Sequence, residues 1–358
     1  MSPKCKSTTA NNNMVSNINK HNTNNCDERL GLTASAVALA ASDLKETPKK
    51  RRQHLKDLRA WLKTQTHLEN MRTDDSFLLR FLRFQKFDLG DTKAVIDKYV
   101  HMRTHHADWF QKLDIREPKM REIMTSGYLV VLPDRDESGR RVIFSRAAAI
   151  DTSKFTACDI MRAHILAYET LLSDPENQVR GLTYVFDERE VSWNHISIWS
   201  PSEISKAFNC CERALPLRHQ EIHFVHLPWT MSLVFTFAKN LLSQKLRERF
   251  QTHSNFDKLA KEFPSHLLPD SCGGNLTMDA ITKSWLAELD AKRDEIVGLD
   301  RMRYGLNKAE DGVSSSSRPA SRKTSLVEGV KAKVSQSSSV LNVVGNVRKM
   351  EGGNERAK

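Results

Sequence analysis

The sequence predicts an α/β protein in which a small N-terminal bundle of three helices precedes a mainly parallel sheet. Apolar residues recur with helical spacing three times between residues 47 and 112, on short connections. From about residue 120, short β-rich runs alternate with helical runs, which is the order typical of parallel sheets. Residues 1–46 and 308–358 are rich in small and polar residues and poor in aromatic ones, so we expect disordered tails there.

The bundle is predicted to begin at Thr47 and Pro48, where the composition changes. Threonine can cap the first turn of a helix, and proline suits the first helical position. A second helix is expected to begin at Asp75 and a third at Asp91. The apolar faces of the three helices contain Leu55, Leu58, Trp61 and Leu62; Phe77, Leu78, Phe81 and Leu82; and Val95, Tyr99 and Met102.

Strands and helices alternate through the predicted α/β domain, residues 113–278. The run from Gly181 to Asp187 is apolar on both faces apart from Thr183 and its terminal Asp187, as expected for a buried strand. A C-terminal helical segment, residues 279–307, follows the domain. The expected elements are strands at 127–132 and 141–146 around a turn at 133–139, a helix at 156–172, a strand at 181–187, a helix at 201–214, a strand at 221–227, and helical stretches at 255–262 and 279–296.

The stretch 221–249 is the most informative part of the chain. Its β-rich run stops at Pro228, and helical spacing follows. The apolar stripe of that helix, continued by three and four residues, reaches Lys245 and then Arg249. A helix that lies on a membrane places apolar and basic groups side by side, but a core helix whose last turn emerges into water also ends in basic residues. Both interpretations remain open at this point. The stripe consists of Met231, Val234, Phe235, Ala238 and Leu242.

Composition narrows the class of partner. The chain has 358 residues, a net charge of +11 and a pI of about 9.3, which favours anionic partners. No run approaches the roughly 18–20 apolar residues that a spanning helix needs, and no signal peptide or lipidation motif is recognisable. The six cysteines lack metal-ligand or disulfide spacing, so we expect reduced thiols and no metal. We therefore expect a cytoplasmic protein that touches membranes peripherally.

Several motifs, in this order, resemble the CRAL-TRIO lipid-binding family. The resemblance covers about residues 47–295 and is strongest to the branch that contains α-tocopherol transfer protein, the retinaldehyde-binding protein and the clavesins. The motifs are Asp75–Arg83, similar to the family's D-x-x-L-L-R-F-L-R; Gly127-Tyr128, the turn 134–139 and Arg141–Phe144, similar to its first hairpin; Phe186-Asp187, similar to its central strand end; Ile222–Pro228, before its gate helix; and Leu268–Gly274, its closing L-P-x-x-x-G-G.

The resemblance implies an apolar cavity that has the sheet as its floor and is closed by a mobile gate helix. It implies one bound hydrophobic lipid (tocopherol-, retinoid- or phospholipid-like), no other cofactor, and no nucleic acid. It also implies a monomer that is peripheral on endosomal or trans-Golgi membranes containing phosphatidylinositol phosphates. The ligand-binding residues are then expected to be Met161, Ile165, Tyr168, Leu182, Tyr184, Phe186, Ile222, Phe224, Val234, Phe235 and Ala238, and the phosphoinositide-binding residues Arg218, Lys245 and Arg249.

Three positions depart from the family pattern. Gln220 replaces a fourth basic residue, which predicts a weaker or differently selective phosphoinositide site. Glu190 stands where the family usually has a glycine, and a glycine with positive φ is costly to replace. Ser271 replaces an acidic residue of the closing motif, which weakens the case for binding a phosphatidylinositol head group as in the yeast members.

Other functions compete with lipid transfer. A membrane-recruited scaffold or trafficking regulator could sense the lipid without bulk transfer, and its tails carry kinase-like sites at Ser321 and Ser325. Catalysis is a further alternative, because Asp187, Glu188 and Glu190 crowd a strand end with His195 near in sequence. Carboxylates in such loops are usually solvated, however, and no catalytic motif accompanies them, so no enzyme activity is expected. No aromatic-interleaved basic strand supports nucleic-acid binding.

Overall fold

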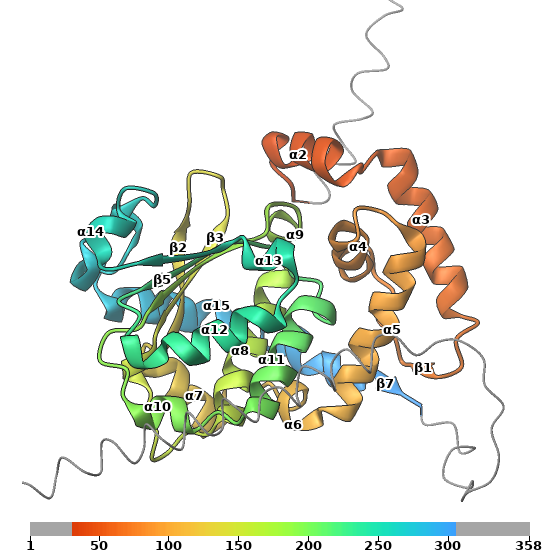
Figure 1. The fold of residues 1–358 in the computed structure, drawn as a ribbon. Coiled ribbons are helices and arrows are strands. Elements are labelled where there is room, and N and C mark those ends of the chain that lie inside the picture. Colours follow the sequence, from red (N-terminus) through yellow and green to blue (C-terminus); the bar gives the residue numbers. More distant parts are fainter. Residues whose placement is uncertain (1–30, 306–358) are drawn as a thin grey trace, which may run out of the picture. The chain divides into compact units, whose positions relative to one another are not determined.

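A five-stranded, mainly parallel sheet organises the computed structural model, which describes residues 31–305 (Figure 1). The strand order is β2-β3-β4-β5-β6; β2 and β3 are antiparallel, and the remaining neighbours are parallel. This arrangement confirms the predicted fold class. The strands are β2 Leu129–Arg135, β3 Arg141–Arg146, β4 Leu182–Asp187, β5 His219–Val225 and β6 Phe250–His253, and a separate antiparallel pair joins β1 Leu68–Glu69 to β7 Arg303–Tyr304.

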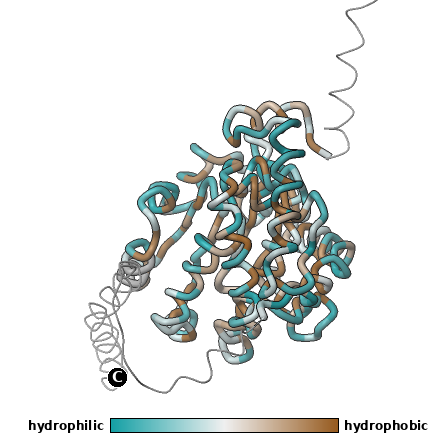
Figure 2. The backbone as a smooth tube through the Cα atoms, turned by 90° about the vertical axis from the view of Figure 1, so that its right-hand side faces the viewer, coloured by the Kyte–Doolittle hydropathy of each residue, from teal (hydrophilic) through white to brown (hydrophobic). Residues whose placement is uncertain are grey.

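Helices precede and surround the sheet, and helix α3 begins at the cap predicted at Thr47. The side chain of Thr47 accepts a hydrogen bond from the backbone N–H of Lys50, and Thr156 forms a capping box with Asp159. Hydrophobic stretches gather toward the inside of the described chain (Figure 2). The helices are α2 Ala34–Leu44, α3 Pro48–Leu62, α4 Asp75–Phe84, α5 Leu89–His105, α6 Ala107–Phe110, α7 Pro118–Thr125, α8 Ala157–Leu172, α9 Pro175–Arg180, α10 Trp193–Ser197, α11 Pro201–Arg213, α12 Ser232–Leu241, α13 Gln244–Arg247, α14 Phe256–Leu259 and α15 Met278–Gly298, with short 3₁₀ turns at η1 Ala147–Ala149, η2 Trp229–Met231, η3 Ser265–Leu267, η4 Asp270–Cys272 and η5 Leu299–Arg301.

Helix α2 corrects the prediction that residues 1–46 are disordered. Its buried residues Ala36, Ala40 and Leu44 pack against Val179 of α9. Small alanines carry a helical period but little apolar area, so this stretch has the composition of a tail although it docks as a helix. Residues 1–30, the predicted tail 308–358 and the last two residues of the segment 279–307 lie outside the described residues.

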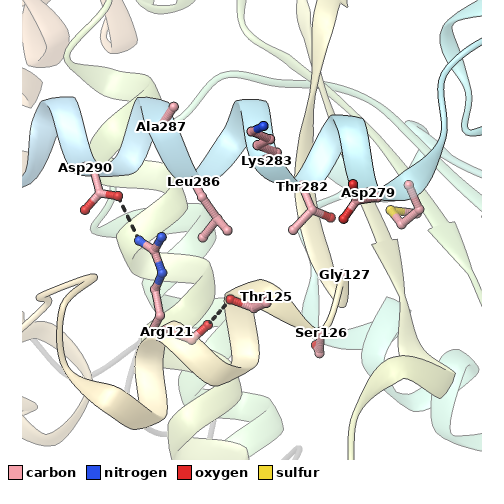
Figure 3. A pocket seen from close by; sticks show the side chains of 11 residues that line it. Arg121, Thr125, Ser126, Gly127, Asp279, Thr282, Lys283, Leu286, Ala287 and Asp290 are labelled. Carbon is pink, nitrogen blue, oxygen red and sulfur yellow. Dashed lines mark hydrogen bonds and ion pairs between the residues drawn. The ribbon is translucent and has the colours of Figure 1, made fainter.

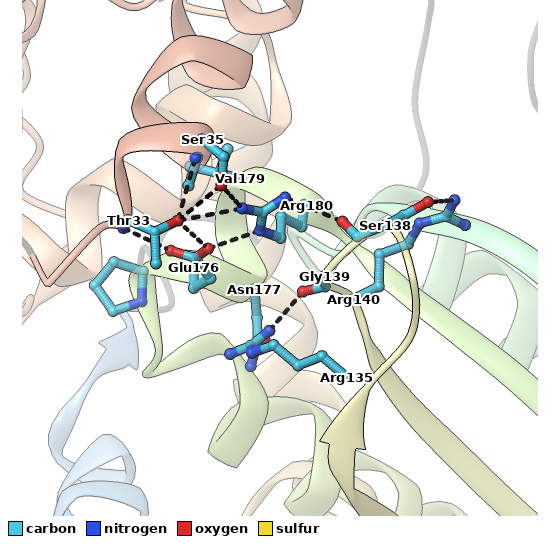
Figure 4. A network of polar contacts seen from close by, with 12 residues as sticks. Thr33, Ser35, Arg135, Ser138, Gly139, Arg140, Glu176, Asn177, Val179 and Arg180 are labelled. Carbon is cyan, nitrogen blue, oxygen red and sulfur yellow. Dashed lines mark hydrogen bonds and ion pairs between the residues drawn. The ribbon is translucent and has the colours of Figure 1, made fainter. Parts of the chain in front are cut away.

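Polar contacts hold α2 in place (Figure 4). The hydroxyl of Thr33 donates to Oε1 of Glu176 over 2.8 Å, and Arg180 donates to the Ser35 hydroxyl over 2.6 Å. Just after the helix, the buried carboxylate of Glu46 accepts hydrogen bonds from Arg51 and Arg83. Residues 31–46 are therefore part of the folded unit.

A buried ion network joins the N-terminal bundle to the α/β domain. Glu169 of α8 is 0% exposed. One of its oxygens lies 2.9 Å from Nη1 of Arg80, and the other lies 2.7 Å from the Tyr99 hydroxyl and 3.4 Å from Nη1 of Arg103. The arginines of the Asp75–Arg83 motif thus have a structural role, because Arg80 and Arg83 each pair with a buried carboxylate.

The predicted gate helix is interrupted, which corrects its expected stripe. Helix α12 ends at Leu241, Leu242 is extended, and the Ser243 side chain caps the separate helix α13. Leu242 is 4% exposed, so it belongs to the core. Arg249 follows α13 directly before β6 and does not continue the apolar stripe of α12. None of the helices within residues 31–305 is long and apolar enough to cross a bilayer.

Candidate functional site

A cavity of about 340 Å³ lies between the sheet and helices α8, α10, α11 and α12. Its wall is mostly aliphatic and aromatic, which is typical of pockets that bury small hydrophobic ligands. Helices α11 and α12 lie on the same side of the sheet (Figure 1). The lining residues are Tyr128, Ser145, Ala147, Met161, His164, Tyr168, Tyr184, Phe186, Glu188, Val191, His195, Ile196, Trp199, Ile204, Ala207, Phe208, Cys211, His219, Ile222, Phe224, Leu227, Met231, Phe235, Leu246 and Phe250.

Seven of the predicted ligand-binding residues line this cavity. They are Met161, Tyr168, Tyr184, Phe186, Ile222, Phe224 and Phe235. Their part in binding a ligand remains a prediction.

Four other predicted residues do not contribute described side chains to the wall. Ile165 is buried outside it, because the spacing i, i+3, i+7 along α8 places His164 in line with Met161 and Tyr168. Leu182 is also buried outside the wall, at the first position of β4. The side chains of Val234 and Ala238 lie outside the described residues.

Aromatic rings connect the sheet at the floor of the cavity to helix α12. The rings of Phe186 and Phe224 are stacked with centroids 4.9 Å apart. Phe235 of α12 meets Phe224 edge-on at 4.8 Å. Such edge-to-face contacts contribute about 0.5–1.5 kcal/mol beyond burial. Phe235 also lies 6.1 Å from the ring of Phe250, so its contacts with the sheet are aromatic.

Helix α11 forms a wall that the sequence interpretation missed. Ile204, Ala207, Phe208 and Cys211 follow the spacing i, i+3, i+4, i+7 of one helical face. That spacing is visible in the printed sequence and could have identified them. Phe250 of β6 and His219 of β5 were also missed, because they depend on which strands are neighbours.

Hydrogen bonds within the wall satisfy most of its polar groups. The Tyr128 hydroxyl lies 2.8 Å from Nε2 of His164, and the Tyr184 hydroxyl lies 2.7 Å from Nδ1 of His219. Burial lowers the pKa of His164 to about 4 and raises the pKa values of Tyr168 and Tyr184. These groups are neutral near pH 7, which keeps that part of the cavity uncharged.

Two of the three strand-end carboxylates, those of Asp187 and Glu188, are buried, which corrects the expectation that they are solvated, whereas Glu190 is exposed. Asp187 is fully buried and pairs with Arg189, whose Nη2 lies 2.6 Å from Oδ2. Glu188 is 8% exposed, lines the cavity, and has its pKa raised to about 7 by burial and by the charge of Asp187. Glu190 adopts φ of 61°, the left-handed conformation that glycine favours. No cluster of potential metal ligands occurs among residues 31–305.

The predicted phosphoinositide-binding residues lie near the opposite strand ends from Glu188. Arg218 and Arg249 directly precede β5 and β6, and Lys245 is exposed on α13. Arg218 already forms an ion pair with Asp43 of α2. Burial, and then the charge of Arg140, lower the pKa of Arg249. The three cations are thus unequal, because Lys245 is exposed while Arg218 is paired and shielded.

A second hollow, of about 590 Å³, lies between α7 and α15 (Figure 3). Its rim is charged: Arg121 donates to Asp290 over 2.8 Å, and Lys283 and Asp279 line the hollow further along α15. Its lining exposes a much larger share of polar surface than that of the first cavity. It is therefore poorly suited to a hydrophobic ligand, and we assign the candidate site to the cavity beneath α12.

Comparison with known proteins gives two family matches. Residues 125–274 match the CRAL/TRIO domain, and residues 47–120 match the Pinta-like UBA domain. Clavesin-1 of Rattus norvegicus is 31% identical over 247 residues, which cover 69% of this chain and 70% of that protein. Clavesin-2 of Homo sapiens is 30% identical over 247 residues, covering 69% and 76%. The crystal structure of Sfh5 aligns with a TM-score of 0.48 and 12% identity, over 71% of this chain and 99% of that one.

Proposed function

The chain belongs to the CRAL-TRIO family of lipid-binding proteins, and we propose that it holds one small hydrophobic lipid in the cavity and transfers or presents it at phosphoinositide-containing membranes. The observation that carries the proposal is the cavity itself. An apolar cavity of about 340 Å³ under a helix is large enough to enclose a small ligand and too apolar to attract a polar one.

Helix α12, with its flanking turns, would be the gate that opens and closes the cavity. Pro228 precedes it, and the extended residue Leu242 separates it from α13. Breaks at both ends allow a helix to move as a unit. Its described inner contacts are mostly aromatic, so a lipid surface could replace them at low cost.

Side chains suited to contact with a membrane lie at both ends of helix α12. Trp229 is 80% exposed at its start, and tryptophan is favoured at membrane interfaces. Lys245 is exposed beyond its end, where it could meet anionic head groups. We infer that this face, defined by Trp229, α12 and Lys245, is the one that meets the membrane, with Arg249 and Arg218 behind it.

The first test is to identify the bound lipid. Solvent extraction of the purified protein followed by mass spectrometry should give one lipid in near-equimolar amount. Phe186→Asp places a charge on the cavity floor and should abolish retention while circular dichroism shows a folded protein. Retention of an equal amount by a folded Phe186→Asp protein, or no lipid from the wild type, would reject the cavity as the site.

The second test concerns the membrane. Each cation near an anionic surface contributes on the order of 1 kcal/mol, so Lys245→Glu/Arg249→Glu should weaken co-sedimentation with phosphoinositide liposomes by several tens of fold. The matched control, Lys56→Glu/Lys283→Glu, makes the same change in net charge on α3 and α15. Added salt should narrow the difference between wild type and variant. Equal losses in both double variants would argue against a specific membrane face.

A vesicle-to-vesicle transfer assay separates transfer from sensing. Transfer of the extracted lipid, faster with phosphoinositide in the acceptor vesicles, is the result that the proposal expects. Retention of the lipid without transfer would favour the membrane-recruited scaffold or trafficking regulator instead. The phosphorylation sites considered for that role, Ser321 and Ser325, lie outside the described residues.

A further inference from the structure

Two polar groups of the cavity wall lack partners among the described residues. The first is the carboxyl group of Glu188. The backbone N–H of Glu188 donates to the carbonyl of Val225 over 2.9 Å, which fixes the residue at the end of β4. Its side chain is nine-tenths buried and lines the cavity, yet no residue within 31–305 forms a hydrogen bond or ion pair with its carboxyl group.

The neighbouring charges do not supply the missing partner. Two guanidinium nitrogens of Arg189 donate to Oδ2 of the adjacent Asp187, Nε over 2.9 Å and Nη2 over 2.6 Å. His226 lies 3.8 Å from the other oxygen of Asp187. The positive charge of Arg189 therefore serves Asp187, and Glu188 is left facing the cavity.

The second unpartnered group is Nε2 of His195, on α10. The backbone N–H of Ser192 donates to Nδ1 of the same ring over 3.1 Å. Nδ1 must then be an acceptor, so Nε2 carries the hydrogen in the neutral ring. Nε2 is buried and has no hydrogen-bond partner, and the ring lines the same cavity.

The remaining polar groups of the wall differ from these two. Tyr128 pairs with His164, and Tyr184 pairs with His219, whose second ring nitrogen lies 3.1 Å from the Cys211 carbonyl. An unpaired acceptor and an unpaired donor thus remain in a wall that is mostly apolar and whose buried tyrosine and histidine pairs are hydrogen-bonded. Buried polar groups without partners are costly, and such a pair points to a ligand that completes them.

We propose that Glu188 and His195 form a polar subsite that recognises a hydroxyl group on the hydrophobic ligand. The hydroxyl hydrogen is donated to the Glu188 carboxylate, and the hydroxyl oxygen accepts from Nε2–H of His195. Ethers, aldehydes and ketones can only accept, so they leave the ionised carboxylate of Glu188 unpaired; this form prevails above pH 7, and the test is therefore made at pH 8. A hydrocarbon leaves both groups unpaired. This inference rests on the proposed function, because it describes what the same cavity selects.

The test is a displacement titration with matched ligands. Dodecanol and dodecyl methyl ether compete for the cavity against the fluorescent probe N-phenylnaphthylamine. A charge-assisted hydrogen bond that is lost inside a buried site reduces affinity by about tenfold to a hundredfold. We expect dodecanol to displace the probe at least about tenfold better than the ether from the wild-type protein.

Three variants locate the source of that preference. Glu188→Leu and His195→Phe each remove one partner and should each reduce the preference for dodecanol. The control Ile165→Leu changes a buried residue of α8 that lies outside the wall, and it should retain the preference. Probe binding reports on folding and on the cavity in every variant. Equal displacement by both ligands from the wild type, or a full preference in both Glu188→Leu and His195→Phe, would overturn the subsite. Failure of the probe and of both ligands to bind wild type would instead count against the proposed function.

Discussion

Two of the glutamates buried in the α/β domain, Glu169 and Glu188, have opposite surroundings. Glu169 meets Arg80, Tyr99 and Arg103 at the junction with the N-terminal bundle. Glu188 meets no partner among residues 31–305 and faces the cavity. A buried carboxylate that holds a fold together is surrounded by donors, whereas one that serves a ligand is left incomplete. The contrast teaches which buried charge is structural and which is available.

The largest expected effect comes from Glu169→Ala. This change leaves Arg80 and Arg103 buried without their shared carboxylate, and breaking such a network costs about 3–5 kcal/mol in the free energy of unfolding. Chemical denaturation measures it. The control is Glu295→Ala, which breaks the part-exposed pair with Arg72 and should cost less than about 1 kcal/mol. Similar losses in both variants would break the comparison.

A smaller effect, of opposite sign, is expected for Glu188→Gln in lipid-free protein. Folding raises the pKa of Glu188 from 4.5 to about 7, so the folded state favours the protonated form. The wild type therefore loses up to about 3 kcal/mol of stability as the pH rises from 4.5 through 7, and the glutamine variant does not. Denaturation at several pH values should show equal stability near pH 4 and a more stable variant at pH 8.

The titration of His164 does not affect the difference in stability between the wild type and Glu188→Gln. Burial lowers its pKa from 6.5 to about 4, so its contribution is lost as the pH falls through that window. The loss is common to wild type and Glu188→Gln and cancels in their difference. A difference that does not change with pH would show that Glu188 is solvated and would remove the contrast with Glu169.

The smallest expected effect concerns Asp43, a third carboxylate, which pairs with Lys86 as well as with Arg218. Asp43 of α2 neutralises Arg218, so Asp43→Ala should expose the Arg218 charge and raise affinity for phosphoinositide liposomes about fivefold, a change near 1 kcal/mol. The control is Asp290→Ala, which frees Arg121 at the α7–α15 hollow and makes the same change in net charge. Equal gains in co-sedimentation for both variants would indicate a general charge effect.

Much of the fold was predictable from local patterns. The caps at Thr47 and Thr156 and the two-faced strand at residues 182–187 depend on neighbours in the chain, so they are visible in the sequence. The docking of α2 was not predictable in this way, because its alanines become buried only through contact with Val179, which is distant in the sequence. The break after Leu241 was hidden because the helical spacing continues through it, while the burial of Leu242 favours an extended turn.

The candidate site was predicted in part for the same reason. Period-two spacing placed Tyr184 and Phe186 on the cavity face, but only the register of α8 shows that His164 lines the wall in place of Ile165. Glu188 attracted attention as a strand-end carboxylate, but its burial depends on tertiary packing, which the sequence does not show. Glu190 shows that the family's glycine position keeps its left-handed backbone even with a glutamate side chain.

The central claim, that the hollow beneath α12 is the lipid site, is tested most directly by filling it. Ala207→Phe adds a ring inside this cavity, and Ala287→Phe adds the same ring in the charged hollow between α7 and α15. Titration with a fluorescent hydrophobic probe should give one site per chain in wild type and in Ala287→Phe, and at least about tenfold weaker binding in Ala207→Phe. Unchanged binding in a folded Ala207→Phe protein, or a loss confined to Ala287→Phe, would contradict the account.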